Sequence, residues 1–401
     1  MFNLDSFIKM HVTKRSNSMF ISDIEMNIQV LKQRIENKSV LVIGGAGSIG
    51  ASFVKAILPF KPALLTIVDI NENALAELTR DIRSTKDVYV PIDYVTYPMD
   101  FASPIFEKMF RNRCGFDIVA NFSAHKHVRS EKDIYSVEAL LQNNVLHAKL
   151  LLDLLSEFPP EEYFCVSTDK AANPVNIMGA SKRIMEDVIF SYSDKFPVKT
   201  ARFANVAFSN GSLPAGFIAR IQKLQPLSAP SDVRRFFVSP EESGQICLLS
   251  CILGENREIF FPKLEEVQMM TFDDIASELL KAHGYEVLEC ESDADAINKA
   301  EDLKRGSNLY PVHYSKSDTS GEKPFEEFVT DTETADMDRF TALGVITGKQ
   351  IPDKAKLEKF FFDLNNAFEA DTSKEEIVRI MKDYLPNFEH IETGKSLDSK
   401  M

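Results

Sequence analysis

Between residues 39 and 206, short apolar runs alternate with longer amphipathic stretches. The apolar runs are rich in β-branched residues and cover 39–45, 63–70, 116–124, 162–168 and 198–206. The stretches between them have the length and composition of helices and cover 52–58, 73–83, 137–155 and 180–193. Strands that alternate with helices predict βαβ units around a parallel sheet. Right-handed crossovers then predict a doubly wound α/β fold with ligands at the carboxyl ends of the strands.

The pattern changes on both sides of this region. Residues 1–37 mix polar and apolar positions and predict one or two leading helices. After residue 207 the alternation breaks down and prolines become frequent, which predicts a smaller mixed lobe. Residues 285–310 and 313–324 are polar and predict loops, whereas 352–390 predict two helices. The predicted organisation is an N-terminal helical extension (1–37), a nucleotide-binding domain (38–206), a mainly substrate-binding lobe (207–330) and a C-terminal helical extension (331–401).

Composition and charge narrow the functional classes. The 401 residues carry a formal charge of −14, which disfavours general binding to nucleic acid or anionic membranes. No apolar run approaches the ~20 residues that span a bilayer, and the first residues lack a signal-peptide core. Five scattered cysteines fit reduced thiols in a cytoplasmic protein. Cys247 and Cys251 lie one helical turn apart, but no second pair completes a zinc site, so we expect no metal and interpret both as buried apolar residues.

A glycine-rich turn follows the first strand. Gly44, Gly47 and Gly50 form a GxxGxxG pattern between that strand and a helix, and Ser48 and Ile49 lie at the start of the helix. Such a turn lets the backbone approach a pyrophosphate, and the helix N-terminus favours its charge. Asp69 ends the next strand, 19 residues after Gly50. Its carboxylate can bind adenosine ribose hydroxyls and would repel a 2′-phosphate, so the pattern predicts a Rossmann-like domain that binds NAD rather than NADP. The alternative is a purely structural turn followed by a surface carboxylate.

Other segments are more specific than this turn. Residues 123–128 read SAHKHV, 167–174 read STDKAANP and 178–183 read MGASKR. With RFANV (202–206), RRFF (234–237) and GEKPFEEF (321–328), they resemble the extended short-chain dehydrogenase/reductase superfamily. Within it, they are similar to the UDP-N-acetylglucosamine 4,6-dehydratases of polysaccharide biosynthesis. The resemblance covers about residues 38–330.

The resemblance implies a reaction and two catalytic residues. Such enzymes oxidise the sugar at C4 with bound NAD, eliminate water across C5 and C6, and return the hydride to C6. The resemblance implies Asp169 as the acid at C6 and Lys170 as the base at C5. Burial raises the pKa of an Asp and lowers that of a Lys, and both roles require these directions.

One position departs from the superfamily. Met178 stands where most members have the Tyr that takes the C4-hydroxyl proton, and a thioether cannot move a proton. Thr168, Asp169 or a water molecule are the candidates for this step. The long-type dehydratases carry the same Met, which implies retention at C5. Lys182 lies four residues further on the same helix face and is expected to hold the nicotinamide ribose.

The remaining expected contacts divide between cofactor and substrate. Those on the cofactor side are Phe122, Ser123, Ala124, Lys126, Ser167 and the helix-borne Asn144, which has a structural role as its alternative. Those on the substrate side are Lys126, His127, Asn205, Ser212, Arg235 and Glu242. Arg235 is the expected diphosphate ligand because a guanidinium fork suits phosphate oxygens, with Arg234 as the alternative. His127 is either a polar wall or a core histidine. Lys132 occupies a usually acidic position, and Thr319-Ser320 replace the usual Arg-Pro before GEK.

These observations predict a hydro-lyase with tightly bound NAD that dehydrates UDP-N-acetylglucosamine and assembles into a homodimer or a higher homo-oligomer. Two alternatives stay open: a nucleotide-sugar 4-epimerase and a catalytically silent NAD-binding module. An epimerase needs neither a C5 base nor a C6 acid, so the adjacent Asp169 and Lys170 argue against it.

Overall fold

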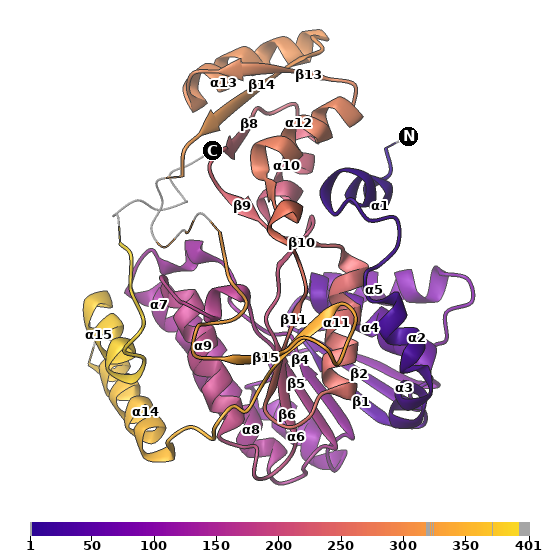
Figure 1. The fold of residues 1–401 in the computed structure, drawn as a ribbon, viewed down its shortest axis with the longest axis vertical. Helices are drawn as coiled ribbons and strands as arrows, with labels where there is room; N and C mark the ends of the chain where they lie inside the picture. Colours follow the sequence, from indigo (N-terminus) through magenta and orange to yellow (C-terminus); the bar gives the residue numbers. More distant parts are fainter. Residues whose placement is uncertain (1, 318–320, 322, 324, 371, 393–401) are drawn as a thin grey trace.

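The centre of the molecule is a nine-stranded sheet (Figure 1). The computed structural model describes residues 2–317, 321, 323, 325–370 and 372–392. Seven neighbouring strands are parallel, in the order β3-β2-β1-β4-β5-β6-β11. Their bounds are β1 (Ser39–Ile43), β2 (Leu64–Asp69), β3 (Asp93–Pro98), β4 (Ile118–Asn121), β5 (Glu162–Val166), β6 (Val198–Ala201) and β11 (Glu258–Pro262). The predicted doubly wound fold is confirmed, and its strand order reverses between β1 and β4, where such folds bind ligands.

Two later strands extend the sheet beyond β11. β16 (Leu343–Thr347) pairs antiparallel with β11, and β15 (Thr334–Asp336) pairs antiparallel with β16. The sequence assigned β11 to the substrate lobe and β15 and β16 to the C-terminal helical extension, but all three lie in the central sheet. β11 is buried along its whole length, so its outer edge needs a paired strand rather than solvent.

Helices cover both faces of the sheet. On one face, α4 (Ser48–Ile57) packs against α11 (Pro240–Leu253), which also contacts α3 (Ile28–Ile35). The other face carries α7 (Ile134–Leu141), α8 (His147–Leu155) and α9 (Ile177–Phe190). The remaining helices of this part are α2 (Ile21–Met26), α5 (Glu72–Ser84) and α6 (Pro104–Asn112). In the described part of the chain, no helix is both long enough and apolar enough to cross a bilayer.

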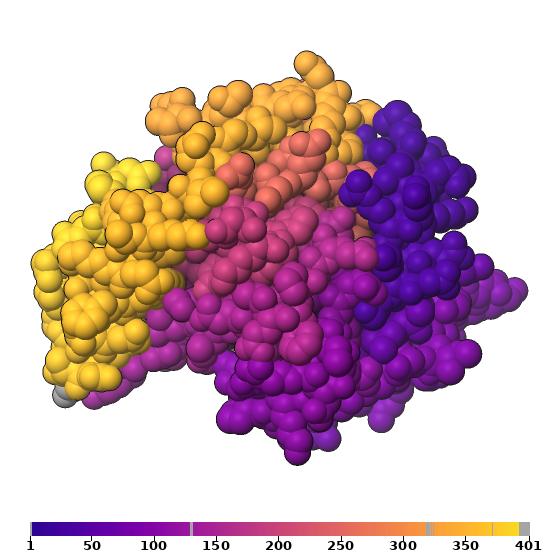
Figure 2. Space-filling model, turned by 90° about the horizontal axis from the view of Figure 1, so that it is seen from below, coloured from indigo at the N-terminus to yellow at the C-terminus, as the bar shows by residue number. Residues whose placement is uncertain are grey.

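The two predicted C-terminal helices are present. α14 (Lys354–Glu369) and α15 (Lys374–Tyr384) pack against each other and bury Phe360 and Tyr384 in the main core. The Tyr384 hydroxyl donates to Asp187 of α9 at 3.2 Å. In the space-filling view, the C-terminal helices (yellow) and the N-terminal segment (indigo) lie on opposite sides of the molecule (Figure 2).

A second, smaller core lies above the carboxyl ends of the strands in Figure 1. Its sheet has the order β13-β14-β8, and its elements are β8 (Leu227–Pro230), α10 (Leu213–Gln222), α12 (Phe272–Ala282), β13 (Glu286–Cys290), α13 (Asp293–Lys299) and β14 (Leu309–Ser315). Two short pairs join this part to the rest: β7 (Asn205–Val206) with β10 (Phe237–Val238), and β9 (Arg234–Arg235) with β12 (Met270–Thr271). The prediction of loops over 285–310 was wrong, because β13 is an edge strand that leaves most of its side chains partly exposed and therefore carries no apolar run.

The N-terminal segment contacts both parts of the molecule. α1 (Leu4–Phe7) and the π-helical turn after it place Phe7 in the second core. Further along, Arg15 forms an ion pair with Glu242 at 2.6 Å, and the buried Asp23 accepts bonds from the backbone of Thr341 and Ala342. Residues 3–35 thus connect the second core with the central sheet.

Candidate active site

A cavity of about 1340 Å³ opens at the carboxyl ends of β1, β4 and β5. One wall comes from the glycine turn, the loop after β4 and the turn after β5, and the opposite wall comes from residues 205–220 and the second core. Single-ligand pockets usually have volumes of 300–1,000 Å³, so this cavity has room for a dinucleotide and a second ligand.

The glycine turn is shaped by close backbone packing. Gly44 has φ +69°, and a Cβ there would lie 2.7 Å from the amide nitrogen of Ser123. A Cβ on Gly50 would overlap the carbonyl oxygen of Gly44. α4 begins directly after Gly47, and no side chain caps its first amides. These amides point their partial positive charge at the cavity, as a pyrophosphate site requires.

Asp69 lines the same end of the cavity. One carboxylate oxygen accepts from Ala46 N at 3.0 Å, and the other accepts from Asn71 N at 2.9 Å. Asp69 therefore fixes the glycine turn as well as facing the cavity. A carboxylate has about four acceptor positions, so two bonds leave capacity for ribose hydroxyls.

The loop after β4 also faces the cavity. Phe122, Ser123 and Ala124 line it, as the sequence predicts for cofactor contacts. Asn144 is buried and does not line it. Its side-chain oxygen accepts from the His125 amide at 2.8 Å, and its side-chain nitrogen donates to the His125 carbonyl at 2.9 Å and to Ser181 Oγ at 3.0 Å. Asn144 lies in a π-helical turn, Gln142–Leu146, and the extra residue in that turn aims Gln142 and Asn143 at the cavity. Asn144 therefore supports the loop and does not face the cavity, so the structure favours the structural alternative over the predicted cofactor contact. Its neighbours Gln142 and Asn143 are lining residues that sequence reasoning missed.

The turn after β5 brings three predicted residues together. Thr168 Oγ1 donates to Asp169 Oδ1 at 2.8 Å, and Lys170 Nζ lies 3.1 Å from the same oxygen. Thr168 and Lys170 line the cavity, whereas Asp169 is only 4% exposed. The turn thus presents a hydroxyl and an amine that share one carboxylate.

The predicted protonation of Lys170 needs a correction. Burial alone lowers the pKa of an amine, but Asp169 and Glu326 hold the pKa of Lys170 above its usual value. Glu326 Oε1 lies 3.8 Å from Lys170 Nζ and is 156 residues away in the chain. GEKPFEEF was recognised as a motif, but nothing in its spacing indicates that Glu326 meets Lys170.

Met178 and Lys182 both lie on α9 and line the cavity. Lys182 is 3% exposed, and burial lowers its pKa. Ser167, also in the cavity wall, donates to Glu186 at 2.7 Å, and Glu186 pairs with the fully buried Arg202. Arg202 of the RFANV segment directly follows β6 and is therefore a structural residue that anchors the end of β6 to α9, through the same Glu186 that bonds Ser167 after β5.

The start of α9 is held by Glu131. Its two carboxylate oxygens accept from the amides of Ile177 and Met178 at 3.0 and 2.8 Å. Burial raises the pKa of Glu131 to about 7. Its backbone oxygen accepts from Lys374 of α15 at 2.7 Å. Glu131, the residue before Lys132, therefore fixes the start of α9, the helix that carries Met178 and Lys182.

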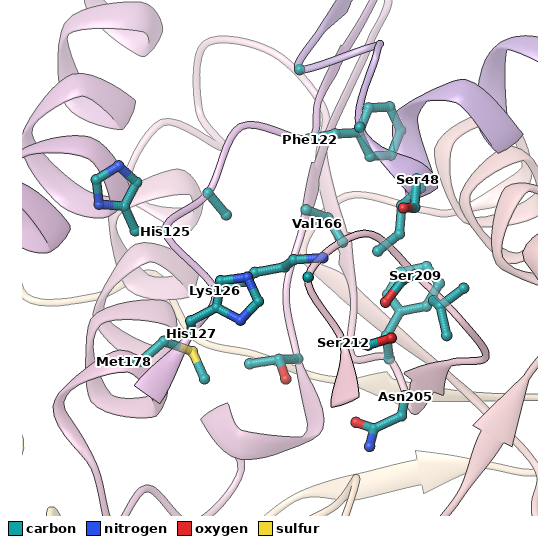
Figure 3. Close-up of a pocket in the computed structure, with 18 of the residues that line it drawn as sticks. Ser48, Phe122, His125, Lys126, His127, Val166, Met178, Asn205, Ser209 and Ser212 are labelled. Carbon is teal, nitrogen blue, oxygen red and sulfur yellow. The ribbon is translucent and has the colours of Figure 1, made fainter. Parts of the chain in front are cut away.

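Four predicted substrate residues meet in the cavity (Figure 3). Lys126 reaches from the loop after β4 toward the segment of Ser209 and Ser212, where its Nζ donates to Asn210 O at 3.0 Å. His127 packs against Gly211, and Asn205 and Ser212 line the opposite wall. Burial lowers the pKa of Lys126.

Two other predicted ligands are placed differently. Glu242 is 1% exposed and bonds Arg15 and the backbone of Ser239 and Met19. It does not line the cavity, so the prediction of a substrate contact is corrected. Arg235 is 5% exposed, and its guanidinium donates to Arg234 O and Lys323 O; it is likewise not a lining residue. Arg220 of α10 does line the cavity and was missed, because helix position alone does not reveal which arginine faces inward.

Some predicted features lie outside this geometry. Thr319, Ser320 and Glu322 lie outside the described residues. Within the described ranges, no group of three His, Cys, Asp or Glu side chains could hold a metal ion. All five cysteines are free thiols, and Cys247 and Cys251 are buried in α11 as expected.

The fold and the cavity define a Rossmann-like protein of the short-chain dehydrogenase/reductase type. The family model described as "Polysaccharide biosynthesis protein" matches residues 40–346. The chain belongs to this family.

Curated relatives are distant in sequence. The chain is 28% identical over 358 residues to an uncharacterized membrane protein of Methanocaldococcus jannaschii, a match that covers 87% of this chain and 96% of that protein. It is 26% identical to the capsular polysaccharide biosynthesis protein CapD of Staphylococcus aureus, over 76% of this chain but only 49% of CapD. It is 27% identical to an inverting UDP-N-acetylglucosamine 4,6-dehydratase of Campylobacter jejuni, over 58% of this chain and 69% of that protein.

Solved structures agree on the fold. Pen from Bacillus thuringiensis superposes with a TM-score of 0.63 at 18% identity, over 82% of this chain and 98% of that one. DesIV from Streptomyces venezuelae, a dTDP-glucose 4,6-dehydratase with NAD bound, superposes with a TM-score of 0.53 at 20% identity, over 72% of this chain and 87% of that one.

Proposed function

We propose that this chain is an enzyme that binds NAD and dehydrates UDP-N-acetylglucosamine to a UDP-4-keto-6-deoxy sugar with retention at C5. The observation that carries the proposal is the cluster at the carboxyl end of β5: Thr168 and Lys170 line a cavity large enough for two ligands, and both bond the buried Asp169. Relatives described as 4,6-dehydratases and as polysaccharide biosynthesis proteins support the dehydration. These 4,6-dehydratases are described as inverting, so the proposed retention rests on the resemblance at Met178 and not on them.

The residues present fit NAD. Close backbone packing at Gly44 and Gly50 holds the glycine turn in shape, and the uncapped first turn of α4 lines the cavity, where its amides can bind a pyrophosphate. Asp69 lines the place expected for the adenosine ribose. Lys182, four residues after Met178, lines the cavity where the nicotinamide ribose is expected. When bound, NAD accepts a hydride from C4 and returns it at C6.

Asp169 and Lys170 together hold the proton that elimination needs. As an ion pair they share one proton, and its transfer from Lys170 to Asp169 creates a neutral amine and a carboxylic acid at once. The amine then removes the C5 proton, while the acid protonates the departing C6 hydroxyl, which leaves as water. Lys170 afterwards returns its proton to C5 on the face from which it came, which gives retention.

Thr168 completes the proton balance. Each turnover removes a proton from the C4 hydroxyl and consumes one at the C6 hydroxyl. The 2.8 Å bond from Thr168 to Asp169 supports these two residues as the path between the positions, since Met178 cannot carry a proton. A water molecule in place of Thr168 is the other path.

The test is NMR of the purified chain incubated with UDP-N-acetylglucosamine in heavy water. The proposal predicts a new 6-methyl signal and deuterium at C5. A 4-epimerase, the activity named for relatives 27% identical over 72% of this chain, would give the C4 epimer without either change. An NAD-binding module without activity would return the substrate unchanged. Cytoplasmic localisation and homo-oligomerisation stay predictions.

A further inference from the structure

Lys170 meets a second carboxylate that comes from a distant segment. Glu326 Oε1 lies 3.8 Å from Lys170 Nζ, and the Glu326 side chain is 4% exposed against 18% for Lys170. Lys170 lines the cavity, whereas Glu326 does not. Glu326 can therefore act on the amine without touching a ligand.

The segment that carries Glu326 is anchored on both sides, to the stretch between the catalytic turn and α9 and to β9. Before Glu326, Asn176 Nδ2 donates to Gly321 O at 2.8 Å, and Arg235 donates to Lys323 O at 3.0 Å. After it, Glu327 accepts from Asn173 at 2.9 Å. Phe328 then stacks between Phe236 and Phe261, at centroid distances of 5.7 and 5.9 Å. These anchors fix where the Glu326 carboxylate lies, so its approach to Lys170 does not depend on a free loop.

We propose that Glu326 is a positioning residue for the Lys170 amine: it holds the amine at the cavity wall and sets its charge. The inference rests on the proposed function for its role in catalysis, because Lys170 is the base in that reaction.

The charges around Lys170 explain how Glu326 can control the protonation of its amine. Lys170 is faced by Asp169, Glu326 and Arg235, and Glu326 is faced by Lys170, Asp169, Arg235 and Lys323. With Asp169 alone, the ion pair is neutral. With Glu326 ionised, the ammonium is attracted by two carboxylates, and Arg235 offsets only part of this attraction. Loss of the Glu326 charge therefore lets Lys170 release its proton at lower pH.

A structural ion pair is the competing explanation, and the chain contains a matched example. Glu258 on β11 is 5% exposed, as is Glu326, and pairs with one cation, Arg339, at 2.7 Å. That pair ties the start of β11 to the segment before β16 and does not line the cavity. Glu258→Gln is therefore the control for the loss of a buried carboxylate as such.

The first experiment measures C5 exchange against pH. Exchange at C5 needs the neutral amine but not the acid, so it should rise as Lys170 loses its proton, and Glu326→Gln should move this rise to lower pH by about one unit, a tenfold change in proton affinity. Glu258→Gln should leave the rise where it is in the unaltered chain. Glu326→Asp, which keeps the charge on a shorter side chain, should restore the pH of the rise but lower kcat. An unchanged rise in Glu326→Gln would overturn the proposal.

The second experiment does not need activity. Lysines of the full chain are reductively methylated with ¹³C, which preserves their charge, and the signal absent from Lys170→Arg is followed against pH by NMR. A lower midpoint in Glu326→Gln but not in Glu258→Gln supports the proposal even if no sugar is turned over, in which case the proposed function alone fails. An equal midpoint in all three proteins overturns the role of Glu326 even if the dehydration is real.

Discussion

The two ends of the cavity are built in different ways. At the cofactor end, the glycine turn, Asp69 and the loop after β4 follow three neighbouring strands and are fixed by bonds of the backbone, such as Ala46 N to Asp69. At the catalytic end, Lys170 depends on Glu326, and the first turn of α9 depends on Glu131, which is itself bound by Lys374. The cofactor end is thus a local structure, whereas the catalytic end is assembled from segments far apart in the chain. Substitutions at the cofactor end should affect the binding of NAD, and substitutions at the catalytic end should affect kcat or its pH dependence.

The largest expected effect is at the catalytic end. Lys170→Ala removes the proposed base, and we expect kcat to fall by about 10³-fold or more, because a positioned acid or base contributes typically 10²–10⁴-fold. NAD retention, measured by releasing the bound cofactor and recording its absorbance, should be unchanged, since Lys170 is not expected to contact it. The exposed Lys354→Ala is the control. If Lys170→Ala lost NAD and activity to the same extent, the separation between a cofactor end and a catalytic end would be contradicted.

Glu131 should give the next largest effect, on stability. Its folded pKa of about 7 lies above the usual 4.5, so the folded chain binds this proton more tightly than the unfolded chain. The tighter proton binding adds to the free energy of unfolding. This added stability is fully present below pH 4.5 and is lost as pH rises through 7, by about 3 kcal/mol at most. Glu131→Gln should flatten that part of the dependence, as measured by urea unfolding at pH 5 and pH 8.

The control for Glu131 is Glu36→Gln, an exposed glutamate directly after α3. It should leave the pH dependence of unfolding as in the unaltered chain. If Glu131→Gln does the same, the carboxylate is not held in the buried position that caps α9.

A substitution in the glycine turn should affect the opposite end. Gly50→Ala places a Cβ on the carbonyl oxygen of Gly44, so the turn must shift away from its anion-binding shape. We expect at least tenfold weaker NAD binding by isothermal titration, with a stability loss of about 1–3 kcal/mol for the overpacking. Lys55→Ala, in the same helix but exposed, should change neither. An unchanged NAD affinity in Gly50→Ala would contradict the assignment of the glycine turn to the NAD-binding site.

The smallest expected effect is on cofactor choice. Asp69→Asn keeps an acceptor but removes the charge that repels a 2′-phosphate, so the preference for NAD over NADP should fall by about tenfold. Competition between the two cofactors, measured by dialysis, gives the ratio. If Asp69→Asn has the same ratio of NAD to NADP affinity as the unaltered chain, Asp69 does not select the cofactor and only stabilises the glycine turn.

The difference between the two ends also explains what the sequence could predict. At the cofactor end, β1, β2, β4, the glycine turn and Asp69 follow from residue spacing, because hydrogen bonds between near neighbours decide their geometry. The sequence missed β3, whose side chains are only partly buried and form no apolar run. The edge strands β15 and β16 were missed because they are short and gain stability only by covering β11. Glu242 was misplaced because its partner, Arg15, lies 227 residues away, and Glu326 was missed because no spacing rule connects it to Lys170.

The reaction itself is tested most directly at the C5 carbon. The measurement is the deuterium content at C5, by NMR, after UDP-N-acetylglucosamine is incubated in heavy water with the unaltered chain or with Lys170→Ala at matched NAD content. The account predicts deuterium at C5 together with a 6-methyl group for the unaltered chain and neither for Lys170→Ala. Exchange at C5 that proceeds equally fast in both proteins would contradict Lys170 as the base.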